Sequence, residues 1–325
     1  MKRSPQYRRA LGTLAGLLVI WAIFALLTDT FLTGRNIENI LLQSANVGAV
    51  AIGLTVVLIV AEIDLSVGAL EAMAGAVTAL LLKFLEFPVA LAIALGLGTV
   101  VLLGAVNGLV TWKVRLPSFV ATLAMLGVAQ GGAFVLTNGR PVNRLPDAFR
   151  FIGTGSIGPL NAAVVITGAL FILTHIILTR TRIGRHLFAV GGNAAAAEMS
   201  GINAGRIKLY ALMYSGFTAG VGGLILSARL NAGDGRFGEG DLLVAVAAVI
   251  IGGTSLFGGV GTMVGTAIGV IMIVSIKTGL VLLNVQDFWQ RIVIGLLIIL
   301  AMVVDQFASG ERGLLKKRRS RETSI

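Results

Sequence analysis

The sequence predicts an all-α, polytopic membrane protein with about ten transmembrane helices, in a single transmembrane domain over residues 1–325. Hydrophobic residues make up 56% of the chain, and the mean hydropathy is +0.93. Charged residues make up 13%, whereas about 25% is typical of soluble domains. A chain with so little charge cannot cover itself with water-compatible surface. Since one span needs roughly 20 apolar residues, this length accommodates about ten spans joined by short loops.

Apolar runs separated by polar or glycine-containing connections place these spans along the chain. We expect them at residues 10–28, 43–60, 67–83, 89–110, 118–137, 160–178, 208–230, 242–257, 261–283 and 288–308. The first run, Leu11–Leu27, follows a basic region, but no Ala-x-Ala-like cleavage site comes after it. We therefore interpret it as a retained span and not as a signal peptide.

The net charge of +11 is distributed as the positive-inside rule requires. Basic residues gather in the tails at about 1–9 and 309–325 and in the loop at about 179–207. This distribution predicts that both tails and this loop are cytoplasmic, and it argues against nucleic-acid binding. The connection 138–158 goes against the rule, because Arg140, Arg144 and Arg150 face only Asp147 there.

The residue types exclude several kinds of chemistry. There are no cysteines, and the two histidines, His175 and His186, have no carboxylate at ligand spacing. We therefore expect no metal site, no cofactor and no catalytic residue. The glycine-rich segment 252–261 lacks the Gly-Lys-Ser/Thr ending of a phosphate-binding loop. The chain is thus not predicted to be an enzyme, and any ATP must be bound and hydrolysed by another subunit.

Two connections differ from ordinary loops. Residues 61–66 and 252–261 each join two apolar runs with almost no tether and carry Ser or Thr near the tip. Backbone that leaves the helix at membrane depth is tolerated where it is buried in protein or lines a watery cavity, and interrupted spans indicate a transport path. Asp64 or Ser66 can alternatively cap the next helix. Glu71, inside an apolar run, either faces a cavity or pairs with a base.

Polar residues within or beside the spans are candidates for a translocation pathway or its gates. They are Asn46, Asp64, Ser66, Glu71, Asn107, Ser118, Thr122, Thr254 and Ser255. Mostly neutral hydrogen-bonding groups suit a sugar, although the same side chains also serve as hydrogen bonds between membrane helices. Lys277 and Arg291 lie near the outer ends of their spans, where long side chains reach the interface.

The loop 179–207 predicts a docking surface for a cytoplasmic partner. Asn193 is placed to cap a short helix that the following alanines propagate, and Gly201 is placed to end it. The residues assigned to this surface are Gly191, Gly192, Asn193, Ala194, Ala195, Ala196, Ala197, Glu198, Ser200 and Gly201.

Six stretches, in order and spacing, resemble the membrane-spanning permease subunits of bacterial ABC importers for monosaccharides of the ribose, xylose and arabinose type. They are Phe31-Leu32-Thr33 with Asn36, Ile63–Gly68, Leu116–Leu123, Ala189–Asn193, Ser200–Asn203 and Gly252–Gly259. The resemblance covers roughly residues 30–308. It implies a multi-pass subunit of the bacterial inner membrane that works as a homodimer among membrane lipids. A cytoplasmic ABC ATPase would drive it by alternating access through a coupling helix at 193–201, and a periplasmic binding protein would deliver the sugar.

The chain also departs from this pattern. Ala194 stands where the family commonly has Glu, and Glu62 where it often has Gly. Leu242 and Val244 stand where an acidic pair is common, and Glu71 is unusual. Import of a polyol, a nucleoside, a signalling furanose or a branched-chain amino acid therefore stays open. So does a role outside transport, as a membrane scaffold or a membrane enzyme.

Overall fold

Helices form nearly all of the computed structural model, which describes the backbone of residues 5–303 and the side chains from Leu11 on. The basic side chains of both termini and the tail 309–325 lie outside the described residues. The longer helices are α1 (Pro5–Leu27), α2 (Gly34–Ile59), α3 (Val67–Lys83), α4 (Val89–Leu109), α5 (Ser118–Thr137), α7 (Ala162–Arg180), α10 (Ala204–Leu230), α11 (Asp241–Ile251) and α12 (Met263–Leu282). Another helix occupies 287–303.

Six helices in the described part are long and apolar enough to cross a membrane. They span Gly34–Ile59, Val89–Val114, Ser118–Thr137, Ala162–Arg180, Ala204–Leu230 and Met263–Leu282. The second of these joins α4 to the π-helical turn η1 (Val110–Val114). Two shorter apolar helices cover Leu11–Leu27 and Asp241–Ile251. The all-α membrane architecture predicted from composition is therefore confirmed.

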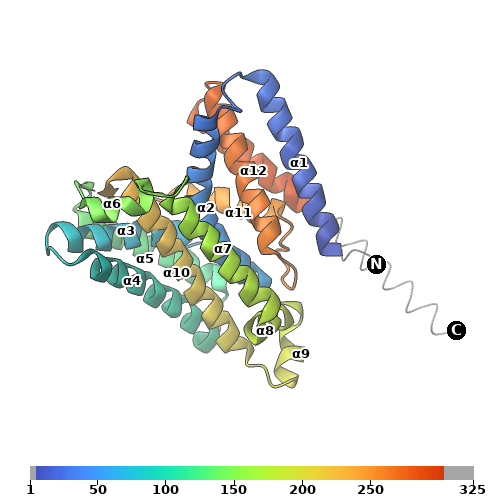
Figure 1. Cartoon of the computed structure of the whole chain (residues 1–325). Helices are drawn as coiled ribbons and strands as arrows, with labels where there is room; N and C mark the ends of the chain where they lie inside the picture. Colours follow the sequence, from blue (N-terminus) through green and yellow to red (C-terminus); the bar gives the residue numbers. More distant parts are fainter. Residues whose placement is uncertain (1–4, 304–325) are drawn as a thin grey trace.

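Helix α2 lies at the centre of the molecule. All of its residues from Ser44 to Ile59 are buried, as expected for a helix with partners on every side. It contacts α7 and α10 in one group of helices, and α11 and α12 in a second group. In Figure 1, α3, α4, α5, α6, α7 and α10 form the first group, and α1, α11 and α12 stand beside each other in the second.

Helix α10 packs most closely in the first group, against α2, α3 and α4. Glycines allow this approach: a Cβ added at Gly223 would overlap with the backbone of Glu71, and one added at Gly104 would overlap with the carbonyl oxygen of Leu212. Close backbone approach through small residues is the usual way in which membrane helices gain packing energy.

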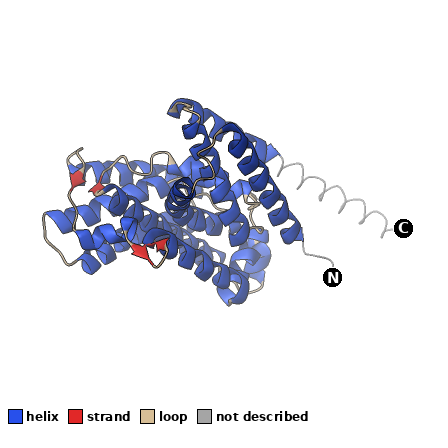
Figure 2. Cartoon of the chain, turned by 45° about the horizontal axis from the view of Figure 1, so that its top comes forward, coloured by secondary structure: helices blue, strands red, loops and turns tan. Residues whose placement is uncertain are grey.

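The connections contain more structure than the sequence suggests. The segment 138–158, predicted as a plain outer connection, contains α6 (Asp147–Thr154) and β1 (Val142–Asn143). Strand β1 pairs antiparallel with β4 (Ala232–Gly233), and β2 (Ser156–Ile157) pairs with β3 (Leu160–Asn161). These short strands appear in Figure 2. The β1–β4 pair ties the end of α5 to the end of α10.

Three expectations about individual segments are wrong. The span expected at 242–257 ends at Ile251, the last residue of α11, because the glycines that follow do not continue the helix. Helix α2 begins at Gly34, not at 43, because its first turns are polar and an apolar run does not reveal them. The loop 179–207 contains two helices instead of one, α8 (Arg182–Gly192) and α9 (Ala194–Met199). Gly191 and Gly192, assigned to the docking surface, form the last turn of α8.

Candidate functional site

Asp64 lies at the centre of a buried polar network in the break between α2 and α3. Its side chain is fully buried. Its Oδ1 accepts hydrogen bonds from the backbone N–H of Ser66 at 2.9 Å and from the Ser66 hydroxyl at 2.6 Å. Its Oδ2 accepts from the hydroxyl of Ser215 in α10 at 2.7 Å. The amide of Asn107 in α4 donates to the Ser66 hydroxyl at 3.1 Å. Asp64 therefore fixes Ser66, the residue before α3, and joins it to α10, but neither side chain forms a capping hydrogen bond with the N–H groups of α3.

Two side chains of α5 satisfy the irregular backbone of the same break. The Ser118 hydroxyl accepts from the N–H of Ile63 at 3.1 Å, and the Thr122 hydroxyl accepts from the N–H of Leu65 at 3.1 Å. Backbone outside a helix needs such partners when it is buried at membrane depth. Asp64, Ser66, Asn107, Ser118 and Thr122, all predicted from the sequence, thus converge on one structural element.

Glu62 ties this break to the start of α10. Its carboxylate, 8% exposed, forms an ion pair with Lys208 at 2.5 Å. Glu62 departs from the family pattern, but nothing in the sequence identifies its partner. The only signal was that a buried acid needs a base, and several bases lie in the loop 179–207.

Three segments, two of which contain glycine, meet by direct backbone contact, in what we call the glycine junction (Ile59, Ala61, Gly191, Gly258 and Gly259). The N–H of Gly259 donates to the carbonyl oxygen of Ile59 at 2.9 Å. A Cβ added at Gly191 would overlap with that same oxygen, and one at Gly258 would meet Ala61 and the carbonyl of Gly191. Gly258 and Gly259 have φ of +84° and +70°, a region that glycine adopts without strain. The junction thus joins the 61–66 break, the end of α8 and the 252–261 turn.

Helix α9 has the caps that the sequence predicts. The Asn193 side chain accepts from the N–H of Ala196 at 3.0 Å, a contact typically worth about 1 kcal/mol. Gly201 follows the helix end with φ of +82°. Ala197 is buried against the core and Ala194 packs beside it.

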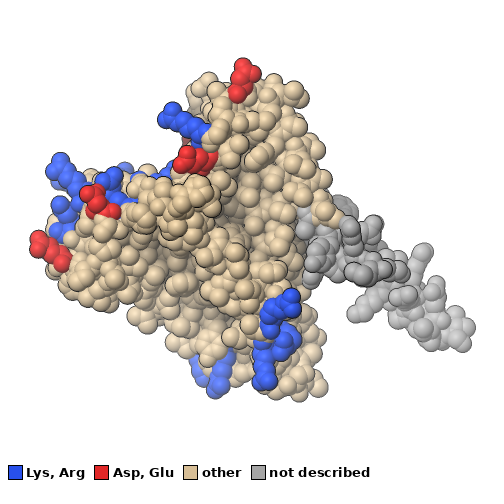
Figure 3. Space-filling view, in the orientation of Figure 1, with Lys and Arg blue, Asp and Glu red and all other residues tan. Residues whose placement is uncertain are grey.

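The other side chains of α9 and its flanks are exposed, and Met199 is 91% exposed. On the face seen in Figure 3, the end of the molecule that carries α8 and α9 shows basic and no acidic side chains, whereas acidic and basic side chains appear together toward the opposite end. This end therefore presents a short, exposed helix surrounded by basic side chains. The exposed bases there include Arg180, Arg182, Arg185 and Arg206.

The remaining predicted pathway residues lie in two other places. Asn46 in α2 donates to the Asp241 carboxylate at 2.8 Å, and Glu71 in α3 lies beside the same Asn46 side chain. Thr254 and Ser255 are buried in the 252–261 turn, where the N–H of Ser255 donates to the carbonyl of Val260 at 3.0 Å. The structure thus separates the nine predicted residues into three groups.

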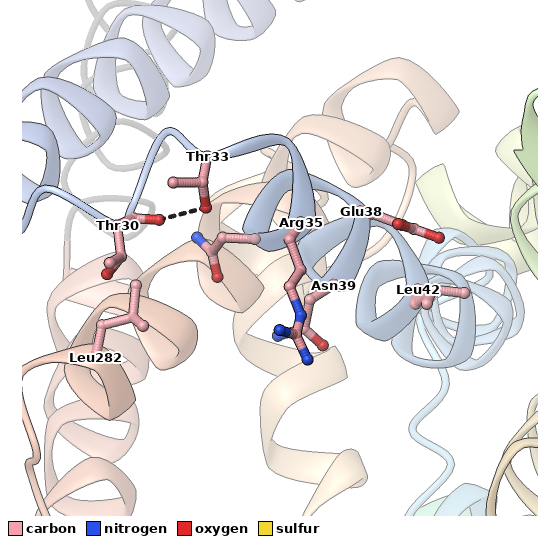
Figure 4. A pocket seen from close by; sticks show the side chains of 8 residues that line it. Thr30, Thr33, Arg35, Glu38, Asn39, Leu42 and Leu282 are labelled. Carbon is pink, nitrogen blue, oxygen red and sulfur yellow. Dashed lines mark hydrogen bonds between the residues drawn. The ribbon is translucent and has the colours of Figure 1, made fainter.

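A cavity of about 620 Å³ opens at the start of α2, near the end of α12. Figure 4 shows the side chains that line it, which are Thr30, Thr33, Arg35, Asn36, Glu38, Asn39, Leu42 and Leu282. None of the predicted pathway residues is among them. Within the described residues, no group of three or more His, Asp or Glu side chains is placed to hold a metal ion.

The loop between α10 and α11 contains a tight local ion pair. Arg236 donates from its Nη2 to the Asp234 carboxylate at 2.7 Å, and from its backbone N–H at 2.9 Å. These bonds lower the pKa of Asp234 below its ordinary value. Gln130 of α5 donates to the carbonyl of Gly235 at 3.1 Å, which joins this loop to α5.

Comparisons with known proteins cover most of the chain. The model of the family described as "Branched-chain amino acid transport system / permease component" matches residues 36–302. The ribose import permease protein RbsC of Escherichia coli (strain K12) is 41% identical over 298 residues, which are 90% of this chain and 92% of that protein. The L-arabinose ABC transporter permease protein AraH of Azospirillum brasilense is 33% identical over 305 residues, 94% of this chain and 90% of that protein. The xylose transport system permease protein XylH of Escherichia coli (strain K12) is 34% identical, covering 90% of each chain. No solved structure matches.

Proposed function

Because the chain belongs to the branched-chain amino acid transport system / permease component family, we propose that it is the membrane permease subunit of an ATP-driven importer for a monosaccharide. One observation carries this proposal: relatives named for ribose, arabinose and xylose are 33–41% identical over nine-tenths of the chain. The family match, residues 36–302, includes the 61–66 break and the glycine junction.

We further propose ten membrane crossings with both termini in the cytoplasm. To the six helices of sufficient length are added α1, α3, α11 and the helix at 287–303, which makes ten. The basic surround of α8 and α9 supports a cytoplasmic position for that end, because basic loops stay on the inside. The protein would be a multi-pass component of the bacterial inner membrane, in contact with lipid and paired with a second copy.

The mechanism that we propose is alternating access driven from α9. A cytoplasmic ABC ATPase, which binds the ATP, would seat on the exposed side chains of α9 and its flanks. Movement of α9 and α8 would reach the 61–66 break and the 252–261 turn through the backbone contacts of the glycine junction. A periplasmic binding protein would deliver the sugar to the other side. The chain needs no cofactor of its own in this scheme.

Reconstitution tests the proposal. Proteoliposomes that contain this chain, the ATPase and the binding protein should take up a pentose, and each omission, including that of ATP, should abolish uptake. Robust uptake by the chain alone would refute the proposal. Uptake by the full assembly of a polyol, a nucleoside, a furanose signal or a branched-chain amino acid, but not of a pentose, would identify a related importer. An assembly that moves no solute would favour a scaffold.

A substitution at Ala196 tests the docking role of α9. Ala196 is exposed, so a bulky residue fits there without disturbing the core. Ala196→Trp should abolish ATP-driven uptake while the protein still inserts and elutes as the unmodified chain does. Normal uptake by this variant would count against docking at α9. Gly201→Trp should act similarly, but it also strains a residue with φ of +82°, so Ala196 gives the cleaner result.

A further inference from the structure

Glu71 is a fully buried acid that no side chain neutralises directly. It lies on α3 at 0% exposure, and among the described residues no donor forms a hydrogen bond with either carboxylate oxygen. Two glycines enclose the carboxyl group: a Cβ added at Gly222 would lie 2.8 Å from Oε1, and one added at Gly238 would lie 2.8 Å from Oε2. The group is therefore held between α10 and the loop that precedes α11.

A second unpaired acceptor lies beside Glu71. Asn46 donates from its Nδ2 to the Oδ2 of Asp241 at 2.8 Å, but its own Oδ1 is buried without any donor. The Asn46 side chain also lies beside the Glu71 carboxyl group. Two oxygens of Glu71 and one of Asn46 are thus buried without a hydrogen-bond donor.

The surrounding charges show which acid stays ionised. The negative charge of Asp241 repels a negative charge on Glu71. The positive charges of Lys277 of α12 and Arg229 of α10 attract the carboxylate of Asp241. Helices α4 and α5, which pack against α3, contain no charged residue. In the loop before α11, Asp234 is already paired with Arg236, and Glu239 is near Gln130. Lys83 lies three turns farther along α3.

Two carboxylates that share one amide disfavour each other's ionised form, and Glu71 is the one that is fully buried, at 0% exposure. An isolated buried carboxylate costs so much free energy that it takes up a proton instead. The two bases stabilise the charge on Asp241, so the proton belongs on Glu71. A proton there gives the Asn46 Oδ1 its missing donor.

We propose that Glu71 is a proton-binding site at neutral pH, in which the Glu71 carboxylic acid donates to Asn46 Oδ1 and Asn46 in turn donates to Asp241. The chain Glu71–Asn46–Asp241 then links α3, α2 and α11 by neutral or singly charged hydrogen bonds. Loss of the proton would place a second negative charge beside Asp241 and force the linked helices apart. This site is independent of the solute that the protein moves.

Infrared difference spectroscopy tests the site directly on the purified full-length chain in lipid nanodiscs. At neutral pH, the carbonyl-stretch band of a protonated carboxylic acid should be present in the unmodified chain and lost in Glu71→Gln. Asp241→Asn, the matched control, should keep the band. Asn46→Val should shift it to higher frequency, because the carboxylic acid loses its acceptor.

Two outcomes would overturn the proposal. The band is absent at neutral pH, or it appears only after Na⁺ and K⁺ are removed, which would make Glu71 a cation ligand. If Glu71→Gln fails to fold, the pH titration of the unmodified chain decides: a band that disappears near the ordinary glutamate value of about 4.3 refutes the site.

A second measurement connects the site to activity. In the reconstituted assembly, uptake should fall as the pH is raised through the loss of the Glu71 proton, and Glu71→Gln should make uptake insensitive to pH over that range. Equal pH profiles for both proteins would show that the proton has no effect on function. Failure of all uptake would refute the proposed function and leave the infrared result standing.

Discussion

Truncation of Asp64 should destabilise the protein more than any other single change in the 61–66 break. The Asp64 carboxylate accepts hydrogen bonds from the Ser66 N–H, the Ser66 hydroxyl and the Ser215 hydroxyl, at 2.6–2.9 Å. A hydrogen bond to a charged group contributes roughly 1.5 kcal/mol or more. Three such bonds give a loss of about 4.5 kcal/mol or more for Asp64→Ala. This is a large part of the roughly 5–15 kcal/mol by which a folded protein is stable.

The matched variant is Asp64→Asn, which keeps the shape and one acceptor oxygen. The Ser215 hydroxyl can rotate and accept from the new amide, so the cost should be about 1–2 kcal/mol. Ser215→Ala alone should cost about 1 kcal/mol. The order of unfolding free energies should therefore be unmodified chain, then Ser215→Ala and Asp64→Asn, then Asp64→Ala.

Equilibrium unfolding in mixed micelles, followed by tryptophan fluorescence, measures these free energies. A double-mutant cycle between Asp64→Ala and Ser215→Ala should give a coupling of about 1–2 kcal/mol, since the residues are in contact. Additive effects would refute the contact, and an Asp64→Ala variant within about 0.5 kcal/mol of the unmodified chain would refute the role of the whole network.

Three further predictions follow from other contacts. Gly191→Ala should abolish ATP-driven uptake in the reconstituted assembly, because its Cβ would overlap with the Ile59 carbonyl. Gly192→Ala, which has open space around it, should be tolerated. Equal effects of the two variants would refute the glycine junction. Glu62→Lys should lower thermal stability through repulsion with Lys208, and the exchanged pair Glu62→Lys with Lys208→Glu should recover most of it; no recovery would argue against the ion pair. The lowered pKa of Asp234 means that its stabilising contact with Arg236 is complete above the unfolded value of about 3.9 and is lost as the pH falls through the lower folded value. The stability difference between the unmodified chain and Arg236→Gln should therefore close on acidification below about pH 4, and a constant difference would contradict it.

Local chemistry was enough to predict several features from the sequence. The apolar runs predicted α3 and α5 to the residue, because no polar turn extends either helix. Asn193 and Gly201 predicted the two ends of α9, since a cap depends on residues only a few positions away. Serine and threonine near the 61–66 break predicted that this backbone needs partners. In each case the interaction that decides the structure is short in sequence or follows from composition.

Features that depend on distant partners were not predictable in the same way. Ser215 looks like one more small residue in α10, and only the crossing of α10 over the break places it against Asp64. Lys208 is one of several bases in its region, and no local pattern selects it for Glu62. The start of α2 was missed for another reason: its first turns contain Arg35 and Glu38, and a search for apolar runs excludes them.

The glycine junction explains why the glycines at 191, 258 and 259 occur where side chains would otherwise pack. Where two segments meet through side chains, one segment can shift without moving the other, because the side chains change rotamer at small cost. Direct contact between two backbones does not allow this adjustment. A displacement of Gly191 must therefore displace the Ile59 carbonyl or break the hydrogen bond from Gly259. Helix α9 itself is attached to the core mainly through Ala194 and Ala197. A partner that moves α9 would therefore act on the break and on the 252–261 turn together.

This requires that the two broken segments respond as one unit, so a spin label at exposed Ala61 and one at exposed Phe257 should report the same ATP-dependent transition. Separate transitions at the two labels would show that the junction is packing and not linkage.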